Sequence, residues 1–121
     1  MGNVRFAQVH PIVGTRDIRK AIDFYVGRLG FALAFQDGGD PPNYVGFRRG
    51  DVVLHMQFQY PYEMGTIRLR LLVDDPDGLY AEYQGTGAAN PGKAPADTAW
   101  GTREFALYDP DGNALTFYRQ R

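Results

Sequence analysis

The amino-acid sequence predicts an α+β fold of two tandem modules, each with the element order β-α-β-β-β, forming a curved mixed sheet with a concave groove. The chain has 121 residues, the size of a single domain, with the modules at about residues 5–60 and 64–121. Helix and strand patterns occur in the same order in both halves. A shift of 58 positions superposes three pairs of helix residues: Asp17 on Asp75, Ala21 on Leu79 and Tyr25 on Tyr83.

The first module is expected to begin with a strand and a helix. Residues 7–14 form an apolar-rich stretch that ends in Gly14, which favours a strand. The next apolar residues recur at the spacing of one helix face: Ile18, Ala21, Ile22, Tyr25 and Leu29. Thr15 or Asp17 would cap the start of this helix, and Gly30 would end it.

Three further strands are expected in the first module. Residues 31–35 alternate Phe, Leu and Phe, which predicts a strand with these three side chains on one face. A loop rich in Gly, Asp and Pro follows. Residues 43–49 and 51–59 then form a hairpin that turns at Gly50 and the Asp after it.

The second module repeats this order. A strand is expected at residues 66–73, and Asp75 opens a short helix with Pro in its first turn. Residues 85–99 are rich in Gly, Pro and Ala, which predicts a long loop with at most one short strand. Strands at residues 103–108 and 114–118 are joined by the strong turn sequence DPDGN.

Alternation along two strands separates a core face from a groove face. In DVVLHMQF the apolar alternate positions must face the helices, which leaves His55 and Gln57 on the other face. In TIRLRLLV the same argument places Arg68 and Arg70 on the groove face. The two arginines are either counter-ions for an anionic ligand or ion-pair partners of acidic residues across the sheet, namely Glu104 or Asp51.

The composition excludes several classes of function. The chain has no Cys, which rules out disulfides, a Cys-based zinc site and a cysteine nucleophile. Thirteen basic and 14 acidic residues give a net charge of −1, so we expect no nucleic-acid partner. No apolar run approaches about 18 residues, and the N-terminus lacks a basic-then-apolar signal pattern. We therefore expect a soluble, cytoplasmic protein without a membrane partner.

A family resemblance rests on three stretches of the sequence: GTRDIRKAIDFYVGRLGFALAF, FRRGDVVLH and WGTREFALYDPDGNALTFY. They resemble the glyoxalase and bleomycin-resistance proteins of the vicinal-oxygen-chelate superfamily, over essentially the whole chain. The likeness is closest to the bleomycin-resistance proteins, which bind the drug without altering it. It implies a homodimer that sequesters a planar aromatic antibiotic or metabolite in grooves between its subunits, without a cofactor. The alternative is a metal-dependent lyase, isomerase or dioxygenase of the same superfamily.

The resemblance also indicates ligand-binding residues. In the drug-binding relatives, aromatic residues from the two subunits sandwich the planar part of the ligand, and these positions correspond to Tyr44 and Trp100. Because the ring carries the stacking, Tyr44→Phe is expected to change binding little. Trp100 could instead close its loop against the core, and His55 could be a cavity histidine bonded to a neighbour. The further expected ligand contacts are His55, Gln57, Arg68 and Gly112.

The superfamily's enzymes hold a divalent metal with four side chains. The resemblance places these metal slots at His10, His55, Arg68 and Thr116. The internal repeat agrees, because a shift of 58 pairs His10 with Arg68 and a shift of 61 pairs His55 with Thr116. An arginine has no lone pair to donate, and a threonine hydroxyl is a poor ligand for a divalent ion. We therefore expect no metal, no catalytic residue and a binding protein rather than an enzyme.

Overall fold

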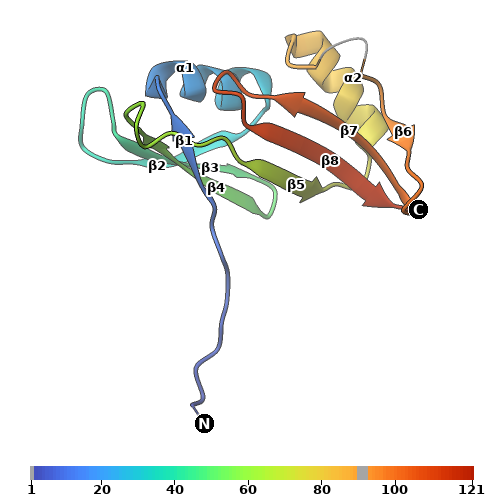
Figure 1. The fold of residues 1–121 in the computed structure, drawn as a ribbon, viewed down its shortest axis with the longest axis horizontal. Coiled ribbons are helices and arrows are strands. Elements are labelled where there is room, and N and C mark those ends of the chain that lie inside the picture. The colour runs from blue at the N-terminus through green and yellow to red at the C-terminus, as the bar shows by residue number, and fades with distance from the viewer. Residues whose placement is uncertain (1, 90–92) are drawn as a thin grey trace.

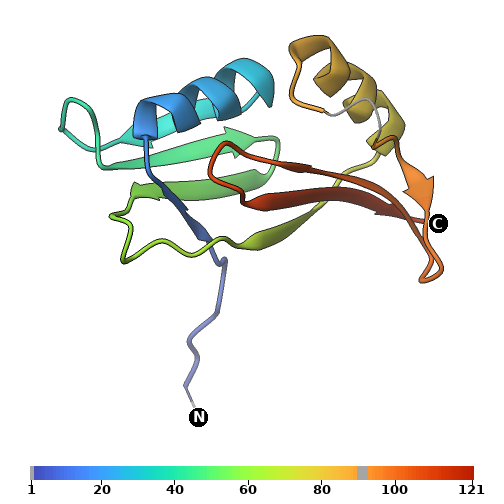
Figure 2. The same cartoon turned by 45° about the horizontal axis from the view of Figure 1, so that its top comes forward.

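The structure, a computed structural model, describes residues 2–89 and 93–121. Its strands form two four-stranded sheets, one in each module (Figure 1). The predicted α+β fold of two modules is confirmed. The strands of the predicted mixed sheet are divided between these two sheets, each of which contains parallel and antiparallel neighbours. Both helices lie on the same side of the sheets, and the N-terminus extends away on the other side (Figures 1 and 2).

The first module contains the sheet with the order β1-β4-β3-β2. Its strands are β1 (Ile12–Thr15), β2 (Ala32–Gln36), β3 (Tyr44–Arg49) and β4 (Val52–Phe58). β1 runs parallel to β4, and the other neighbours are antiparallel. The helical segment starts as α1 (Ile18–Ile22) and continues as the π-helical η1 (Asp23–Arg28).

Local side-chain and backbone chemistry explains where this helical segment begins and ends. The Asp17 carboxylate accepts a hydrogen bond of 3.1 Å from the backbone N–H of Lys20, so Asp17 is the N-cap. Gly30 follows the last turn with a φ of +77°, a conformation that favours glycine. Within residues 2–89 and 93–121, no helix has the length and apolar character needed to span a membrane.

The first strand is shorter than predicted. Residues 7–14 were expected to form it, but β1 begins only at Ile12, since Pro11 has no N–H to donate to the sheet. Residues 2–11 form an extended arm that projects from the side opposite the helices (Figures 1 and 2). Three apolar side chains of this N-terminal arm are almost fully exposed: Val4, Phe6 and Val9, at 81%, 95% and 88%.

The second module contains the sheet with the order β5-β8-β7-β6. Its elements are β5 (Arg68–Leu72), α2 (Pro76–Thr86), β6 (Ala96–Asp97), β7 (Thr102–Tyr108) and β8 (Ala114–Gln120). Asp75 caps α2 by accepting a hydrogen bond of 3.0 Å from a backbone N–H of its first turn. Ile12 lies opposite His55 in the first sheet, and Arg70 lies opposite Thr116 in the second. Ile12 and Arg70 are separated by the predicted shift of 58 positions, and their partners His55 and Thr116 by the predicted shift of 61.

Aromatic rings dominate the core between the helices and the sheets. Tyr25 stacks on Phe47 at 5.0 Å between ring centroids, and Phe105 stacks on Phe117 at 5.2 Å. The predicted alternation along β4 is confirmed, with Leu54 and Met56 buried on the core face. The largest fully buried apolar side chains are Tyr25, Tyr83, Phe47, Phe117, Leu29, Met56 and Leu115. The opposite, outer faces of both sheets are therefore the faces available to a ligand.

A buried hydrogen-bond network centred on Asp109 joins the two modules. One Asp109 oxygen accepts hydrogen bonds from the Tyr25 hydroxyl, at 2.8 Å, and from the Asn113 side chain, at 2.9 Å. The other oxygen accepts two backbone N–H bonds, each of 2.9 Å, from Asp111 and Asn113. Burial and the Asp109 charge raise the pKa of Tyr25, so its hydroxyl stays a donor. The predicted DPDGN turn is confirmed, and it also connects the modules.

Candidate ligand-binding site

Four rings gather on the outer face of the first sheet. We call them the aromatic cluster: His10, Phe35, Tyr44 and His55. His10 stacks on His55 with 4.8 Å between ring centroids, and Phe35 approaches His55 edge-on at 5.1 Å. Tyr44 approaches His55 edge-on at 5.5 Å and stacks with Phe35 at 6.2 Å. Aromatic pairs prefer these arrangements, and the cluster offers a stacking surface to a flat molecule.

A β-bulge and a glycine bring Phe35 into the cluster. The pairing register of β2 and β3 shifts between Leu33 and Phe35, so that Phe35 lies opposite Gly46. A Cβ atom on Gly46 would lie 2.5 Å from the Phe35 ring, so only glycine leaves room for it. The prediction that the alternating side chains of residues 31–35 share one face is therefore wrong. Phe31 is buried in the core, whereas the extra residue of the bulge turns Phe35 to the outer face.

His55 is held within the cluster by Tyr44. The Tyr44 hydroxyl lies 2.7 Å from Nδ1 of His55, which makes His55 a histidine bonded to its neighbour, one of the two alternatives the sequence left open. Burial lowers the pKa of His55, and the adjacent His10 lowers it further. The ring is therefore neutral at pH 7, and a ligand contact through its other nitrogen stays a prediction.

We expect the imidazole of His55 to titrate below its ordinary pKa of 6.5. The variant His10→Ala should raise this pKa, because it removes a neighbouring charge and admits water to the His55 ring. NMR titration of the imidazole protons measures both values, and His55 is the only histidine left in the variant. Gln8→Ala, a change in the adjacent arm, is the control and should leave the pKa in place. An unshifted pKa in the wild type, or no change in His10→Ala, would contradict the stacked arrangement.

The outer face of the second sheet is charged around Arg70. Arg70 forms an ion pair of 3.0 Å with Glu104, and its guanidinium carbon lies 4.3 Å from the centroid of the Tyr118 ring. The predicted pairing of an arginine with Glu104 is thus confirmed for Arg70. Hydrogen bonds hold the pKa of Glu104 below its usual value, chiefly the one from Arg70 and also those from Thr102 and Trp100. Glu104 is therefore ionised at neutral pH.

Trp100 is open to solvent in the turn before β7. Its side chain is 68% exposed, so the alternative that it closes its loop against the core is wrong. Tyr44 belongs to the other sheet, and its ring contacts within the described residues are with Phe35 and His55. A sandwich between Tyr44 and Trp100 therefore stays a prediction, and we expect it to require the Trp100 of a second subunit.

The other predicted ligand residues lie in three places. Gln57 is exposed and pairs with Tyr44 across β3 and β4, next to the aromatic cluster. Arg68 is exposed at the start of β5, and its side chain has no ion pair or hydrogen bond with any residue that the structure describes. Gly112 lies in the turn between β7 and β8 with a φ of +86°, so the backbone conformation accounts for a glycine here. Ligand contacts by these three residues remain predictions.

The four metal slots do not fit a divalent ion. His10 and His55 stack on each other in the first module, whereas Arg68 and Thr116 belong to the second sheet. Two imidazoles, a permanent cation and a hydroxyl are an unsuitable donor set, because the arginine has no lone pair to donate and the threonine hydroxyl is a poor ligand for a divalent ion. In the described part of the chain, no three His, Asp or Glu side chains are grouped so that they could hold a metal.

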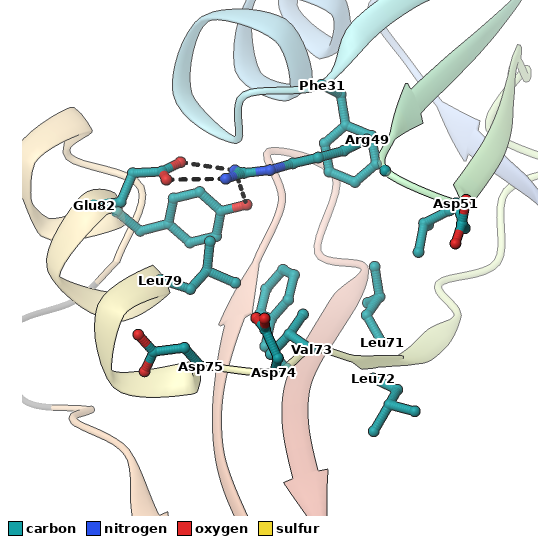
Figure 3. Close-up of a pocket in the computed structure, with 14 residues that line it drawn as sticks. Phe31, Arg49, Asp51, Leu71, Leu72, Val73, Asp74, Asp75, Leu79 and Glu82 are labelled. Atoms are coloured by element: carbon teal, nitrogen blue, oxygen red, sulfur yellow. Dashed lines mark hydrogen bonds and ion pairs between the residues drawn. The ribbon is translucent and has the colours of Figure 1, made fainter.

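A groove of about 560 Å³ lies between the modules beside α2 (Figure 3). Arg49 of β3 crosses it to Glu82 of α2, with two nitrogen–oxygen distances of 2.7 and 2.9 Å. Arg49 lowers the pKa of Glu82, and Glu82 in turn raises the pKa of Arg49. Arg49 also donates to the backbone oxygen of Leu29 at 2.7 Å. This ion pair ties the modules together, and we assign it a structural role.

A second hollow, of about 400 Å³, lies where the modules meet beside the N-terminal arm. Its charged and titratable lining residues come from both modules: His10, Arg48, Asp51 and Arg70. His10 connects this hollow to the aromatic cluster through its stacking on His55. We call this hollow the arginine hollow.

Sequence analysis missed two residues of this surface. Phe35 was assigned to the wrong face, because nothing in the local sequence marks the bulge. Arg48 was overlooked although its position alternates with the apolar Val45 and Phe47, a signal that could have placed it on the outer face with Tyr44.

Comparison with known proteins places the chain in a family. A profile of the glyoxalase/bleomycin resistance protein/dioxygenase superfamily matches residues 7–117. A bleomycin resistance protein from Geobacillus stearothermophilus is 27% identical over 128 residues, covering 91% of this chain and 94% of that protein. The bleomycin-binding protein from bleomycin-producing Streptomyces verticillus, in complex with copper(II)-bleomycin, has a TM-score of 0.77 and 28% identity, covering 98% of this chain and 99% of its own.

An antibiotic binding protein from Streptomyces sp. CB03234 is similar to the same degree. Its structure has a TM-score of 0.78 and 27% identity, covering 98% of this chain and 100% of its own. Together with the profile match over most of the chain, these likenesses support one assignment. The chain belongs to the glyoxalase/bleomycin resistance protein/dioxygenase superfamily.

Proposed function

We propose that this protein binds a planar small molecule, such as an antibiotic, and sequesters it without chemical change. The observation that carries the proposal is the aromatic cluster on the outer face of the first sheet, where the ring of Phe35 is 41% exposed. The likeness to bleomycin resistance and bleomycin-binding proteins supports it. The unsuitable donor set at the metal slots disfavours the enzyme alternative. The proposal includes a cytoplasmic location, because a sequestering protein protects a cell by capturing the drug inside it.

The proposed binding unit is a homodimer. The chain has 7668 Å² of accessible surface, whereas a compact monomer of its 13.6 kDa mass would have about 6,600 Å². A typical stable interface covers about 800 Å² on each partner, which is comparable with this excess. The exposed apolar side chains of the N-terminal arm and the exposed Trp100 supply surface that a second subunit can cover. A dimer also allows Tyr44 and Trp100 of different subunits to face one ligand.

Sedimentation equilibrium is expected to give twice the 13.6 kDa chain mass at micromolar concentration. The variant Phe6→Ala should weaken the dimer, because Phe6 is 95% exposed in the single chain and is available to a partner. Val26→Ala is the control, since Val26 is an apolar residue at 38% exposure on the helical side. A monomeric mass for the wild type would contradict the dimer.

Titration with bleomycin and other flat antibiotics tests the proposed function. Binding is expected to quench the fluorescence of Trp100, the only tryptophan in the chain. Chromatography after incubation should recover the ligand unchanged. Conversion of the ligand, together with a stoichiometric metal that is lost in His55→Ala, would favour the enzyme alternative. A tryptophan signal that no planar compound alters would contradict the proposal.

A further inference from the structure

The outer faces of the two sheets carry an excess of arginine. Arg48 lies on the outer face of the first sheet, and Arg68 and Arg70 lie on the outer face of the second. Among the described residues of the strands, Glu104 is the one carboxylate on these faces. The whole chain has a net charge of −1, so its acidic residues are concentrated elsewhere. The faces that would contact the ligand are therefore positive in an otherwise slightly acidic protein.

Two of these three arginines are available to a ligand. Arg70 is held by Glu104 and by the Tyr118 ring. The side chains of Arg48 and Arg68, in contrast, have no ion pair or hydrogen bond with any residue in the described part of the chain. An arginine guanidinium presents several N–H donors in one plane, which matches the two oxygens of a carboxylate.

The arginine hollow brings charge from both modules next to the aromatic cluster. Arg48 and Arg70 line it together, and Val53 and Leu72 contribute apolar wall. Asp51 also lines this hollow and would repel an anion there. Because His10 both lines the hollow and stacks on His55, a molecule lying on the cluster can reach the hollow with a substituent.

Building on the proposed function, we infer that the ligand is an acidic planar molecule, whose rings lie on the aromatic cluster and whose carboxylate is bound in the arginine hollow by Arg48, beside the Arg70–Glu104 ion pair. The aromatic cluster supplies stacking, and Arg48 supplies charge-assisted hydrogen bonds. Asp51 limits the affinity, because its carboxylate shares the hollow with that of the ligand.

A set of matched compounds tests this assignment. Anthracene-2-carboxylate, its carboxamide and 2-(aminomethyl)anthracene share a flat ring system and differ in charge. Isothermal titration calorimetry is expected to show that the carboxylate binds about 10-fold more tightly than the amide, since hydrogen bonds to charged groups are the stronger ones. The amine should bind most weakly. Added salt should reduce this preference for the carboxylate.

Three variants locate the charge effect. Arg48→Gln should weaken binding of the carboxylate about 5- to 20-fold and leave the amide unchanged. Asp51→Asn should strengthen binding of the carboxylate, because it removes the competing charge. Arg28→Gln is the matched control, with the same charge change at an exposed residue of η1 on the helical side, and should alter neither compound.

The outcomes separate this inference from the proposed function. If the amide or the amine binds as tightly as the carboxylate, the acidic-ligand inference is wrong, while binding of flat molecules still supports the proposed function. Equal losses in Arg48→Gln and Arg28→Gln would also overturn the inference, because the effect would then be one of net charge. If none of the three compounds binds, the inference fails, and the titration with bleomycin and other flat antibiotics decides the proposed function separately.

Discussion

Asp109→Ala is expected to lower the free energy of unfolding by about 3 kcal/mol or more, the largest stability effect we predict. The variant leaves four donors without their acceptor: the Tyr25 hydroxyl, the Asn113 side chain and the backbone N–H groups of Asp111 and Asn113. Each unsatisfied buried donor costs about 1–3 kcal/mol, although water entering the cavity offsets part of this loss. Urea denaturation followed by circular dichroism measures the change.

Two comparison variants make this prediction specific. Asp74→Ala removes an exposed carboxylate that forms no hydrogen bond with the described residues, and should change stability by less than about 0.5 kcal/mol. Tyr25→Phe removes one of the four donors and should cost less than Asp109→Ala. If Asp109→Ala were as stable as Asp74→Ala, the network would not be what holds the modules together.

Trp100→Ala is expected to weaken binding of a planar ligand by about 1–3 kcal/mol, the usual cost of truncating an aromatic anchor. The free energy of unfolding should hardly change, because Trp100 is 68% exposed and contributes little to the core. Calorimetry is the appropriate measurement, since the variant has lost the only tryptophan fluorophore.

Aromatic substitutions elsewhere provide the controls for Trp100. Tyr62→Ala removes a ring that is 85% exposed and stacks on Tyr60 outside the aromatic cluster, so ligand affinity should not change. Tyr44→Ala should weaken binding as Trp100→Ala does. Tyr44→Phe keeps the ring but releases His55, so any loss of affinity in this variant reports the orientation of His55. Affinity that is indifferent to Trp100→Ala would refute the sandwich.

The duplicated fold could be predicted from the sequence because its signals are local and periodic. The helical spacing from Ile18 to Leu29, the caps at Asp17 and Asp75, and the glycine turns all act within a few residues. Strand alternation is also a local signal, because successive side chains of a strand point to opposite sides. It placed His55 and Arg70 on the outer faces.

The bulge and the shortened first strand could not be read in this way. Phe35 changes faces because β2 gains one residue relative to β3, and that choice depends on how the ring packs over Gly46. The sequence 7–14 is apolar enough for a strand, yet pairing begins at Ile12. Register between strands is a property of two segments together, so neither segment reveals it alone.

The sequence by itself determined the repeat, the order of elements and the residue types available to a ligand: aromatic rings, arginines and two histidines that lack a carboxylate partner in the metal slots. Only the tertiary structure decided which of them meet. It stacked His10 on His55, bonded Tyr44 to His55, and brought Arg48 and Arg70 from different modules to one hollow. The physical reason is that side-chain chemistry is local to each residue, whereas distances between segments far apart in the chain follow from how the buried faces pack.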